Sequence, residues 1–184
     1  TPGIEKYRAW DILNTSYALN ARRRDFYKGE VIAFLKLCRE EGLDPLSIKS
    51  SYAGAMGVPQ FMPSSVLAYA VDADLDGKRN LWSSNEDIYS SVANYLMRNG
   101  WKKDGPIYFP VKVSGNPADT QRVVEGGIYK TIPASDAVKT GIEMPDWVGS
   151  TETVSFVYYK PESEKDLFVA LFDNFRAITR YNIS

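Results

Sequence analysis

The side-chain pattern changes near Asp104, and this change restricts the chain to folds that combine a helical part with a small sheet. Before this point apolar residues recur at helical spacing, as Trp10 and Leu13 do. Asp25 is a good N-cap and Gly42 a good C-terminal stop, so a long helix is predicted between them. In all, the pattern predicts helices over 10–18, 25–41, 64–69 and 84–98.

Beyond Asp104 the chain is rich in β-branched and aromatic residues interrupted by Gly and Pro, which is typical of a small sheet. Gly126 and Gly127 predict a hairpin turn, and a final helix is predicted from Lys165. The predicted strands are 107–113, 122–132 and 154–160. We therefore expect an α+β fold that is mainly α: a helical body (1–103), a small β-rich insertion (104–164) and a C-terminal helical segment returning to the body (165–184).

Charge and the rarer residue types exclude several classes of function. The 22 Lys and Arg against 23 Asp and Glu leave a net charge of −1, which argues against nucleic acid or an anionic membrane as partner. Histidine is absent, so His-based triads and His-ligated zinc are excluded. Cys38 is the single cysteine; it forms no internal disulfide and is expected in the core. No apolar run is long enough to span a bilayer.

The segment 51–65 combines small residues with neutral hydrogen-bonding side chains. The small residues let the backbone approach a partner closely, while Ser51, Gln60 and the Ser64–Ser65 pair offer donors and acceptors. A carbohydrate requires this combination because it presents hydroxyls and amides rather than charges. A glycine-rich turn at which two helices pack explains the same residues, and on these residues alone it is slightly favoured.

Three aspartates at alternate positions form a candidate metal site. Asp72, Asp74, Asp76 and Gly77 match positions one, three, five and six of an EF-hand calcium loop. Lys78 at position seven would contribute its backbone carbonyl. This spacing favours calcium over a solvated Asp-rich turn, and over magnesium, which prefers fewer carboxylates and more retained waters.

The last ligand of this loop departs from the EF-hand pattern. Position twelve is Ser83, which cannot supply the usual bidentate carboxylate. Glu86 or Asp87 would complete the site if the loop is longer than the standard one, and the sequence leaves the choice between them open.

Other polar residues give weaker signals. The run of Arg22, Arg23 and Arg24 is typical of a solvated surface. The alternatives are a clamp on substrate carboxylates and a charge partner inside a cleft. Tyr181 and Asn182 would suit a groove lining or the packed start of a helix. Each acid of the N-terminal helices is interpreted as a cap or a surface residue; these acids are Glu5, Asp11, Asp25 and Glu30.

Together the motifs resemble the lytic murein transglycosylase B family, lysozyme-like enzymes that cut bacterial peptidoglycan. The resemblance is long and specific over segment 51–65 and continues through loop 72–82. Shorter matches lie at 11–13, 22–23, 91–95, 100–101, 174–175 and 178–182. It is much weaker over 104–164.

The resemblance implies a reaction that uses one glutamate and no water. That glutamate protonates the glycosidic oxygen between N-acetylmuramic acid and N-acetylglucosamine, then takes the proton of the muramoyl C6 hydroxyl, which attacks the anomeric carbon. The family's glutamate lies in a Glu-(Ser/Thr)-x-x-Gly stretch, which the resemblance places just ahead of Thr1. We therefore expect the catalytic acid to be absent from this chain, and the chain to be a fragment of a longer enzyme.

The resemblance also implies the remaining site residues. Ser51 would lie beside the acid/base, and Gln60 would contact the N-acetyl or hydroxyl groups of a sugar. The implied substrate-binding residues are Ser51, Gln60, Tyr95, Tyr181, Asn182, Arg22 and Arg23. A structural calcium ion would be held by Asp72, Asp74, Asp76, the carbonyl of Lys78 and either Glu86 or Asp87.

From the same resemblance we expect peptidoglycan glycan strands as partner, a monomer, no organic cofactor, and a location in the bacterial periplasm or at the outer membrane. Two alternatives remain: a module that binds glycan strands without cutting them, and a calcium-stabilised adaptor with a vestigial groove. A gene that encodes the Glu-(Ser/Thr)-x-x-Gly stretch would favour the enzyme.

Overall fold

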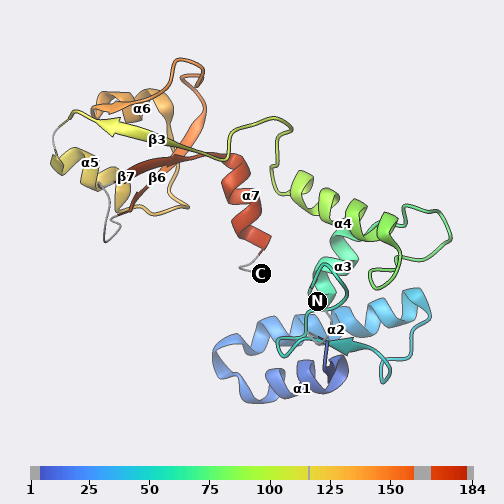
Figure 1. Cartoon of the computed structure of the whole chain (residues 1–184). Coiled ribbons are helices and arrows are strands. Elements are labelled where there is room, and N and C mark those ends of the chain that lie inside the picture. Colours follow the sequence, from blue (N-terminus) through green and yellow to red (C-terminus); the bar gives the residue numbers. More distant parts are fainter. Residues whose placement is uncertain (1–4, 116, 160–166, 182–184) are drawn as a thin grey trace. The chain divides into compact units, whose positions relative to one another are not determined.

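The computed structural model describes residues 5–115, 117–159 and 167–181. The chain divides into two compact units, Thr1–Tyr95 and Leu96–Ser184, and helix α4 (Asn85–Arg98) runs through the division (Figure 1). The boundaries expected at 104 and 165 stay predictions. No helix in the described part of the chain is both long and apolar enough to cross a membrane.

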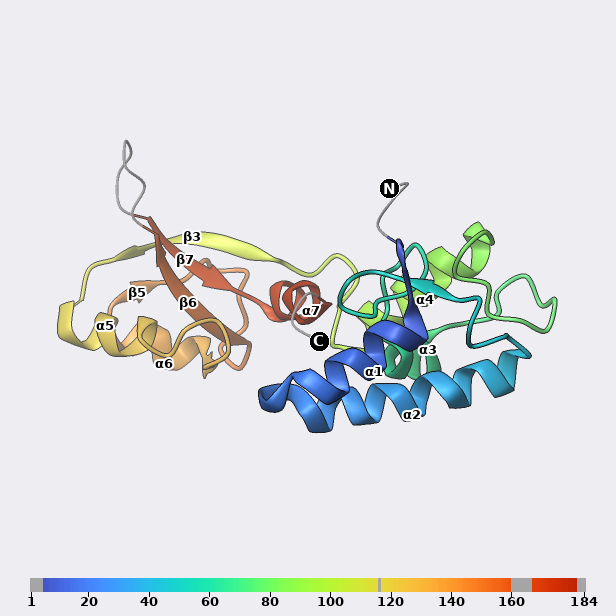
Figure 2. The ribbon, with the colours of Figure 1, turned by 90° about the horizontal axis from the view of Figure 1, so that it is seen from below.

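The first unit is built from helices and one short strand pair. Helices α1 and α2 pack side by side, α3 packs on α2, and β1 pairs antiparallel with β2 (Figure 2). The elements of this unit before α4 are β1 (Tyr7–Arg8), α1 (Ala9–Leu19), the 3-10 turn η1 (Ala21–Arg23), α2 (Arg24–Glu41), β2 (Lys49–Ser50) and α3 (Pro63–Tyr69).

Local signals explain the ends of α2 and α3. Gly42 adopts a left-handed conformation with φ +65°, and its N–H donates to the carbonyl of Cys38, which ends α2 as the sequence predicted. Pro63 occupies the first position of α3, where its missing N–H costs nothing. Phe34 and Cys38 lie on the buried face of α2, so the expected core position of the cysteine is confirmed.

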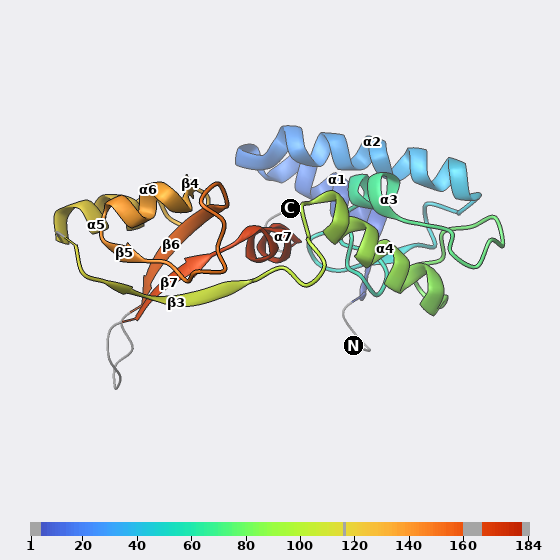
Figure 3. The same ribbon diagram turned by 90° about the horizontal axis from the view of Figure 1, so that it is seen from above.

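The second unit contains a five-stranded antiparallel sheet in the order β4-β6-β7-β3-β5 (Figure 3). Its strands are β3 (Tyr108–Val113), β4 (Ile132–Pro133), β5 (Ile142–Glu143), β6 (Thr153–Tyr159) and β7 (Leu167–Leu171). Its helices after α4 are α5 (Pro117–Val124), α6 (Ala134–Lys139) and α7 (Asp173–Tyr181).

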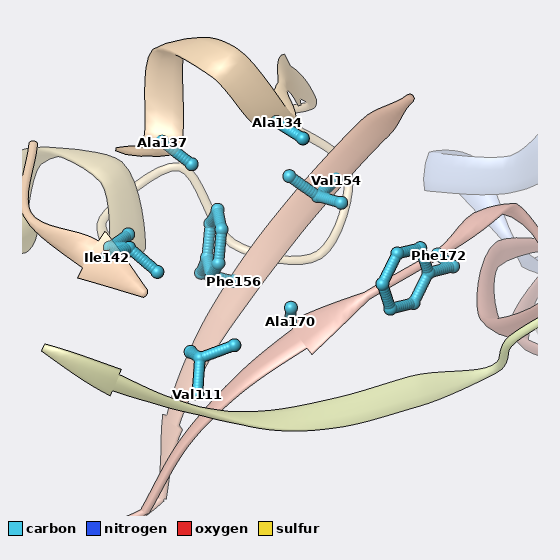
Figure 4. Close-up of a cluster of buried hydrophobic side chains, with 8 residues drawn as sticks. All are labelled: Val111, Ala134, Ala137, Ile142, Val154, Phe156, Ala170 and Phe172. Atoms are coloured by element: carbon cyan, nitrogen blue, oxygen red, sulfur yellow. The ribbon is translucent and has the colours of Figure 1, made fainter. Parts of the chain in front are cut away.

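The core of the second unit lies between the sheet and helix α6 (Figure 4). Phe156 of β6 and Ala170 of β7 are register partners and face Ala137 of α6 across this core. Val123 and Val124 of α5 pack against the same cluster. Helices α5 and α6 therefore cover the apolar side of the sheet.

A predicted strand and a predicted hairpin turn are wrong in this unit. Most of the strand expected over 122–132 is absent, because Val123 and Val124 belong to α5 and bury their side chains from a helix. Gly127, with φ +64°, lies in the turn that follows that helix and not in a hairpin, and its N–H donates to the carbonyl of Val124. Burial against the sheet outweighs the intrinsic strand preference of valine.

The first part of the helix expected from Lys165 is also wrong, because Leu167–Leu171 forms β7, a central strand with neighbours on both sides. Phe168, Ala170 and Phe172 alternate toward the core, which fits a strand as well as a helix until the pairing partners are known. The helix begins only at Asp173. The strands expected near 107–113 and 154–160 are confirmed as β3 and β6.

Candidate functional site

Segment 51–65 links β2 to α3 in the first unit, and its first residue is held by its own backbone. Ser51 is buried, and its Oγ accepts hydrogen bonds from the N–H groups of Ala53 and Ala55 at 3.3 and 3.1 Å. The main-chain N–H of Ser51 donates to the carbonyl of Ala55 at 2.8 Å. Two bonds thus use the acceptor capacity of Oγ, and among the described residues the hydroxyl hydrogen is left to donate.

The glycines of the segment serve packing. Gly54 and Gly57 have φ values of +92° and +67°, which favour glycine. A Cβ added at Gly54 would lie 2.6 Å from Leu13 Cδ2 of α1, and one added at Gly57 would lie 2.8 Å from Leu81 Cβ. Close packing therefore explains why Gly54 and Gly57 are small, and this holds independently of what the polar residues bind.

Gln60 lies in a tight turn whose ends are joined by an antiparallel bridge between Met56 and Phe61. Its φ of +56° is uncommon for a residue other than glycine. Its main-chain N–H and its side-chain Nε2 both donate to the carbonyl oxygen of Gly57, at 3.0 and 2.8 Å. The half-buried carboxamide is thus held in one orientation by its own turn.

Two carboxylates attach segment 51–65 to the rest of the unit. Glu5 accepts a hydrogen bond from the N–H of Gly57. Glu30 of α2 is only 4% exposed and accepts from the N–H and the hydroxyl of Ser64, at 2.9 and 2.6 Å. The interpretation of these acids as caps or surface residues is wrong for Glu30. A signal was present, because Glu30 lies three residues after Tyr27 and four before Phe34, on the apolar face of α2.

Tyr95 supports the segment from α4. Its side chain is 4% exposed, and its ring packs at 5.7 Å from that of Phe61 and at 4.8 Å, edge to face, from that of Tyr69. The ring therefore offers little surface to a ligand and contributes mainly by holding Phe61. Its role in lining a cleft stays a prediction.

The loop 72–82, called the acidic loop below, brings three carboxylates together. Oxygen atoms of Asp72, Asp74 and Asp87 all lie within 4.8 Å of one another. Asp87 is fully buried at the start of α4, and its two oxygens accept from the N–H groups of Ala73 and Asn80, both at 2.7 Å. Asp87 therefore holds both ends of the loop as well as joining the cluster.

Asp72 carries a signal that points to a cation. Its Oδ2 accepts from the N–H of Gly77 at 2.9 Å, whereas its Oδ1 is a buried polar atom without a hydrogen-bond partner in the described structure. A buried carboxylate oxygen needs such a partner. A set of oxygen ligands with this unsatisfied atom fits a hard cation such as Ca²⁺.

The predicted carboxylate ligands Asp76 and Glu86 are not part of this cluster of Asp, Glu, His and Cys side chains. Asp76 accepts from the N–H of Lys78 at 2.8 Å, and Lys78 is exposed. Glu86 is exposed and not part of the group, whereas its neighbour Asp87 is. The geometry thus favours Asp87 at the point where the sequence left the choice open.

The acidic loop is fastened to the end of α2. Arg79 contacts Glu41 through its Nε and Nη2 and Glu40 through its Nη2, the last at 3.1 Å. The N–H of Arg79 also donates to Glu41 at 3.2 Å. These contacts fix the loop independently of any ion.

The remaining predicted residues lie elsewhere. Arg22 and Arg23 are exposed in η1, and the Arg23 guanidinium lies 4.1 Å from the centre of the Phe26 ring. Tyr181 is the last residue of α7 in the second unit, and Asn182 lies outside the described residues. The predicted roles of these four residues stay predictions.

In the second unit, an ionic cluster joins α7 to the segment after α4. Partial burial opposes ionisation of Asp173, but hydrogen bonds and charge from Lys102 and Arg176 outweigh it and lower the pKa of this carboxyl. Lys102 Nζ lies 2.9 Å from the Asp173 carboxylate, and this hydrogen bond raises the pKa of the lysine.

Burial raises the pKa of the Cys38 thiol in the first unit, which makes that cysteine a poor nucleophile.

The first unit thus combines a serine and a glutamine held by their own backbone with an acidic loop. Residues 3–184 match the family model described as Transglycosylase SLT domain, and the chain belongs to this family. Membrane-bound lytic murein transglycosylase B of Escherichia coli (strain K12) is 35% identical over 179 residues, which are 97% of this chain and 47% of that relative. The chain thus spans about half the length of the curated relative it matches.

Solved structures of lytic transglycosylases are similar to this chain along nearly its whole length. Soluble lytic transglycosylase SltB1 of Pseudomonas aeruginosa has a TM-score of 0.87 at 36% identity, covering 100% of this chain and 60% of that one. E. coli lytic transglycosylase Slt35 in complex with calcium has a TM-score of 0.81 at 34% identity, covering 98% and 55%. P. aeruginosa SltB3 in complex with NAG-anhNAM-pentapeptide has 0.79 at 29%, covering 100% and 48%. The expected lysozyme-like α+β fold and the family resemblance are confirmed.

Proposed function

We propose that the protein containing this chain is a peptidoglycan lytic transglycosylase, which cleaves the β-1,4 bond between N-acetylmuramic acid and N-acetylglucosamine and forms 1,6-anhydro-N-acetylmuramic acid. Family membership supports the enzyme class. The observation that carries the proposal is one segment that combines a Ser51 hydroxyl left to donate with a Gln60 carboxamide on a fixed turn. Preorganised neutral groups of this kind suit a sugar, whose hydroxyls and N-acetyl groups carry no charge.

In this proposal the chain's residues bind and orient the glycan. Gln60 contacts the N-acetyl or hydroxyl groups of a sugar, and Ser51 donates to the catalytic carboxyl or to the substrate. The attacking group is the C6 hydroxyl of the muramoyl residue itself, which an intramolecular position supplies at high effective concentration. Glu5 and Glu30 each accept hydrogen bonds from segment 51–65, so neither is assigned as acid/base. The glutamate that the resemblance places ahead of Thr1 keeps that role.

We further propose that Asp72, Asp74 and Asp87 hold a structural calcium ion. The orphan Oδ1 of Asp72 and the carboxylate cluster support it, and the Slt35 structure was solved with calcium. Asp76 and the carbonyl of Lys78 stay predicted ligands from the loop spacing. The ion would neutralise carboxylates and fasten the loop, and it takes no part in the reaction.

The proposed partner is the peptidoglycan glycan strand, in line with the NAG-anhNAM-pentapeptide held by SltB3. A periplasmic or outer-membrane-associated location follows from that substrate, and the E. coli relative is described as membrane-bound. That the protein is a monomer stays a prediction.

Murein sacculi incubated with the protein expressed from its complete gene test this function. Mass spectrometry should detect 1,6-anhydro-muropeptides. Reducing-end products would indicate hydrolysis and contradict a transglycosylase. Sedimentation with sacculi without any released product would favour the alternative of a glycan-binding module, which the engagement of Glu5 and Glu30 with backbone would also fit.

A further inference from the structure

The turn that carries Gln60 is attached to Glu5, a residue distant in sequence. The half-buried Glu5 carboxylate accepts a hydrogen bond from the N–H of Gly57. The carbonyl of the same glycine accepts both the main-chain N–H and the Nε2 of Gln60, at 3.0 and 2.8 Å. Hydrogen bonds through Gly57 therefore link the Glu5 carboxylate to the Gln60 carboxamide.

Both peptide groups that flank Gly57 are fixed from outside the turn. Glu5 holds the N–H of the peptide before the glycine, and the carbonyl of Leu81 accepts the N–H of Val58 in the peptide after it, at 2.9 Å. These two anchors define the conformation of Gly57, whose φ is +67°. That conformation aims the Gly57 carbonyl at the Gln60 side chain.

The turn needs such anchors because its conformation is unfavourable by itself. Gln60 has a φ of +56°, a region that non-glycine residues populate only when the surroundings impose it. A bond from a backbone N–H to an ionised carboxylate is charge-assisted and stronger than a neutral one. Glu5 thus supplies a strong constraint close to the proposed sugar contact.

We propose that Glu5 is a positioning residue for Gln60: it fixes Gly57, and Gly57 orients the Gln60 carboxamide toward the glycan. This inference rests on the proposed function of Gln60 as a sugar contact. Glu5 acts through the backbone and needs no contact with the substrate. The requirement is for an acceptor at this position, and the negative charge strengthens the bond.

Calorimetric binding of a tetrasaccharide of alternating N-acetylglucosamine and N-acetylmuramic acid tests the proposal. Glu5→Ala should weaken binding about three- to tenfold, the size expected when one positioning hydrogen bond is lost. Glu5→Gln should bind within about twofold of wild type, because its carbonyl oxygen can still accept from Gly57. Lys6→Ala, at the exposed neighbouring position, is the matched control.

A double-mutant cycle with Gln60→Ala separates positioning from a general loss of stability. If Glu5 acts through Gln60, the double variant Glu5→Ala/Gln60→Ala should bind like Gln60→Ala alone. Additive losses would overturn the proposal, and so would a Glu5→Ala variant that binds like wild type. If Glu5→Ala fails to fold, the shorter Glu5→Asp replaces it in the same cycle.

The side-chain amide signals of Gln60 in an NMR spectrum give a readout that needs no glycan. They should shift in Glu5→Ala and return toward the wild-type position in Glu5→Gln. Unchanged signals in Glu5→Ala would overturn the positioning role. Failure of the wild-type chain to bind the tetrasaccharide would instead contradict the proposed function, while the amide signals would still decide whether Glu5 orients Gln60.

Discussion

The carboxylate of Glu30 binds Ser64 twice, once at the main-chain N–H at 2.9 Å and once at the hydroxyl at 2.6 Å. Glu30 lies on α2 and Ser64 in the first turn of α3, so this pair joins the two helices directly. The N–H belongs to a helix start, where no intrahelical acceptor is available. A buried acid on one helix thus completes the beginning of another and fixes the end of segment 51–65.

We expect Glu30→Ala to lower the free energy of unfolding by about 1–3 kcal/mol, because it leaves a partly buried donor without an acceptor. Urea unfolding followed by circular dichroism measures the change. Glu30→Gln should cost less, since its one carbonyl oxygen can still accept a bond. Lys28→Ala, on the exposed side of α2, is the control and should change stability by less than about 0.5 kcal/mol. Equal stabilities for Glu30→Ala and Lys28→Ala would contradict the finding.

We expect Asp74→Ala to weaken calcium binding and to lower the melting temperature in calcium but not in EDTA. Asp74 contributes an exposed carboxylate to the cluster, so its removal matters mainly when an ion is bound. Calorimetry with calcium chloride and melting curves in the two buffers measure both effects.

Glu86→Gln is the matched control for calcium binding, because Glu86 is exposed and lies outside the cluster. It should bind calcium like wild type. A large loss of calcium affinity in Glu86→Gln would show that Glu86 is the last ligand of the site. An equal loss of stability for Asp74→Ala in calcium and in EDTA would contradict the proposed metal site.

We expect Asn174→Ala to destabilise the second unit by about 1–3 kcal/mol, since partly buried main-chain groups lose the hydrogen bonds of this side chain. The Asn174 side chain accepts from the N–H of Lys102 at 2.7 Å and donates to the carbonyls of Lys102 and Gly105, both at 2.8 Å. Asn174→Asp keeps the acceptor and loses both donated bonds, so it should also destabilise. Chemical unfolding would contradict this account if Asn174→Asp were as stable as wild type.

The ion pair between Lys102 and Asp173 predicts a pH dependence. The folded-state pKa of Asp173 is lowered from 3.8, so its contribution is fully present above about pH 3.8 and is lost as the pH falls through the lower folded value. The folded-state pKa of Lys102 is raised from 10.5, so its contribution is present below that pH and is lost as the pH rises through the higher folded value.

Melting temperatures of wild type and Asp173→Asn across this range test the acid limb. The advantage of wild type should be constant near neutral pH and should shrink as the pH falls below about 3.8. A difference that stays constant down to the lowest pH at which the protein folds would show that the carboxylate charge contributes nothing.

The errors in the predicted elements share one cause. Leu167–Leu171 and Pro117–Val124 carry apolar residues whose spacing fits either a strand or a helix, and only the partners available in space decide between them. β7 is a strand because β3 and β6 lie on its two sides. α5 is a helix because Val123 and Val124 pack against the buried cluster from a helical turn.

The sequence by itself determined the features that depend on near neighbours: the end of α2 at Gly42, the start of α3 at Pro63, and the Asp72–Asp74 spacing of the acidic loop. It also carried the family resemblance, because segment 51–65 is one continuous stretch. The tertiary structure alone decided that Glu30 is buried against Ser64, that Asp87 rather than Glu86 joins the carboxylates, and that Glu5 holds Gly57. The reason is that burial and hydrogen bonding of a polar side chain depend on groups tens of residues away, which no local pattern contains.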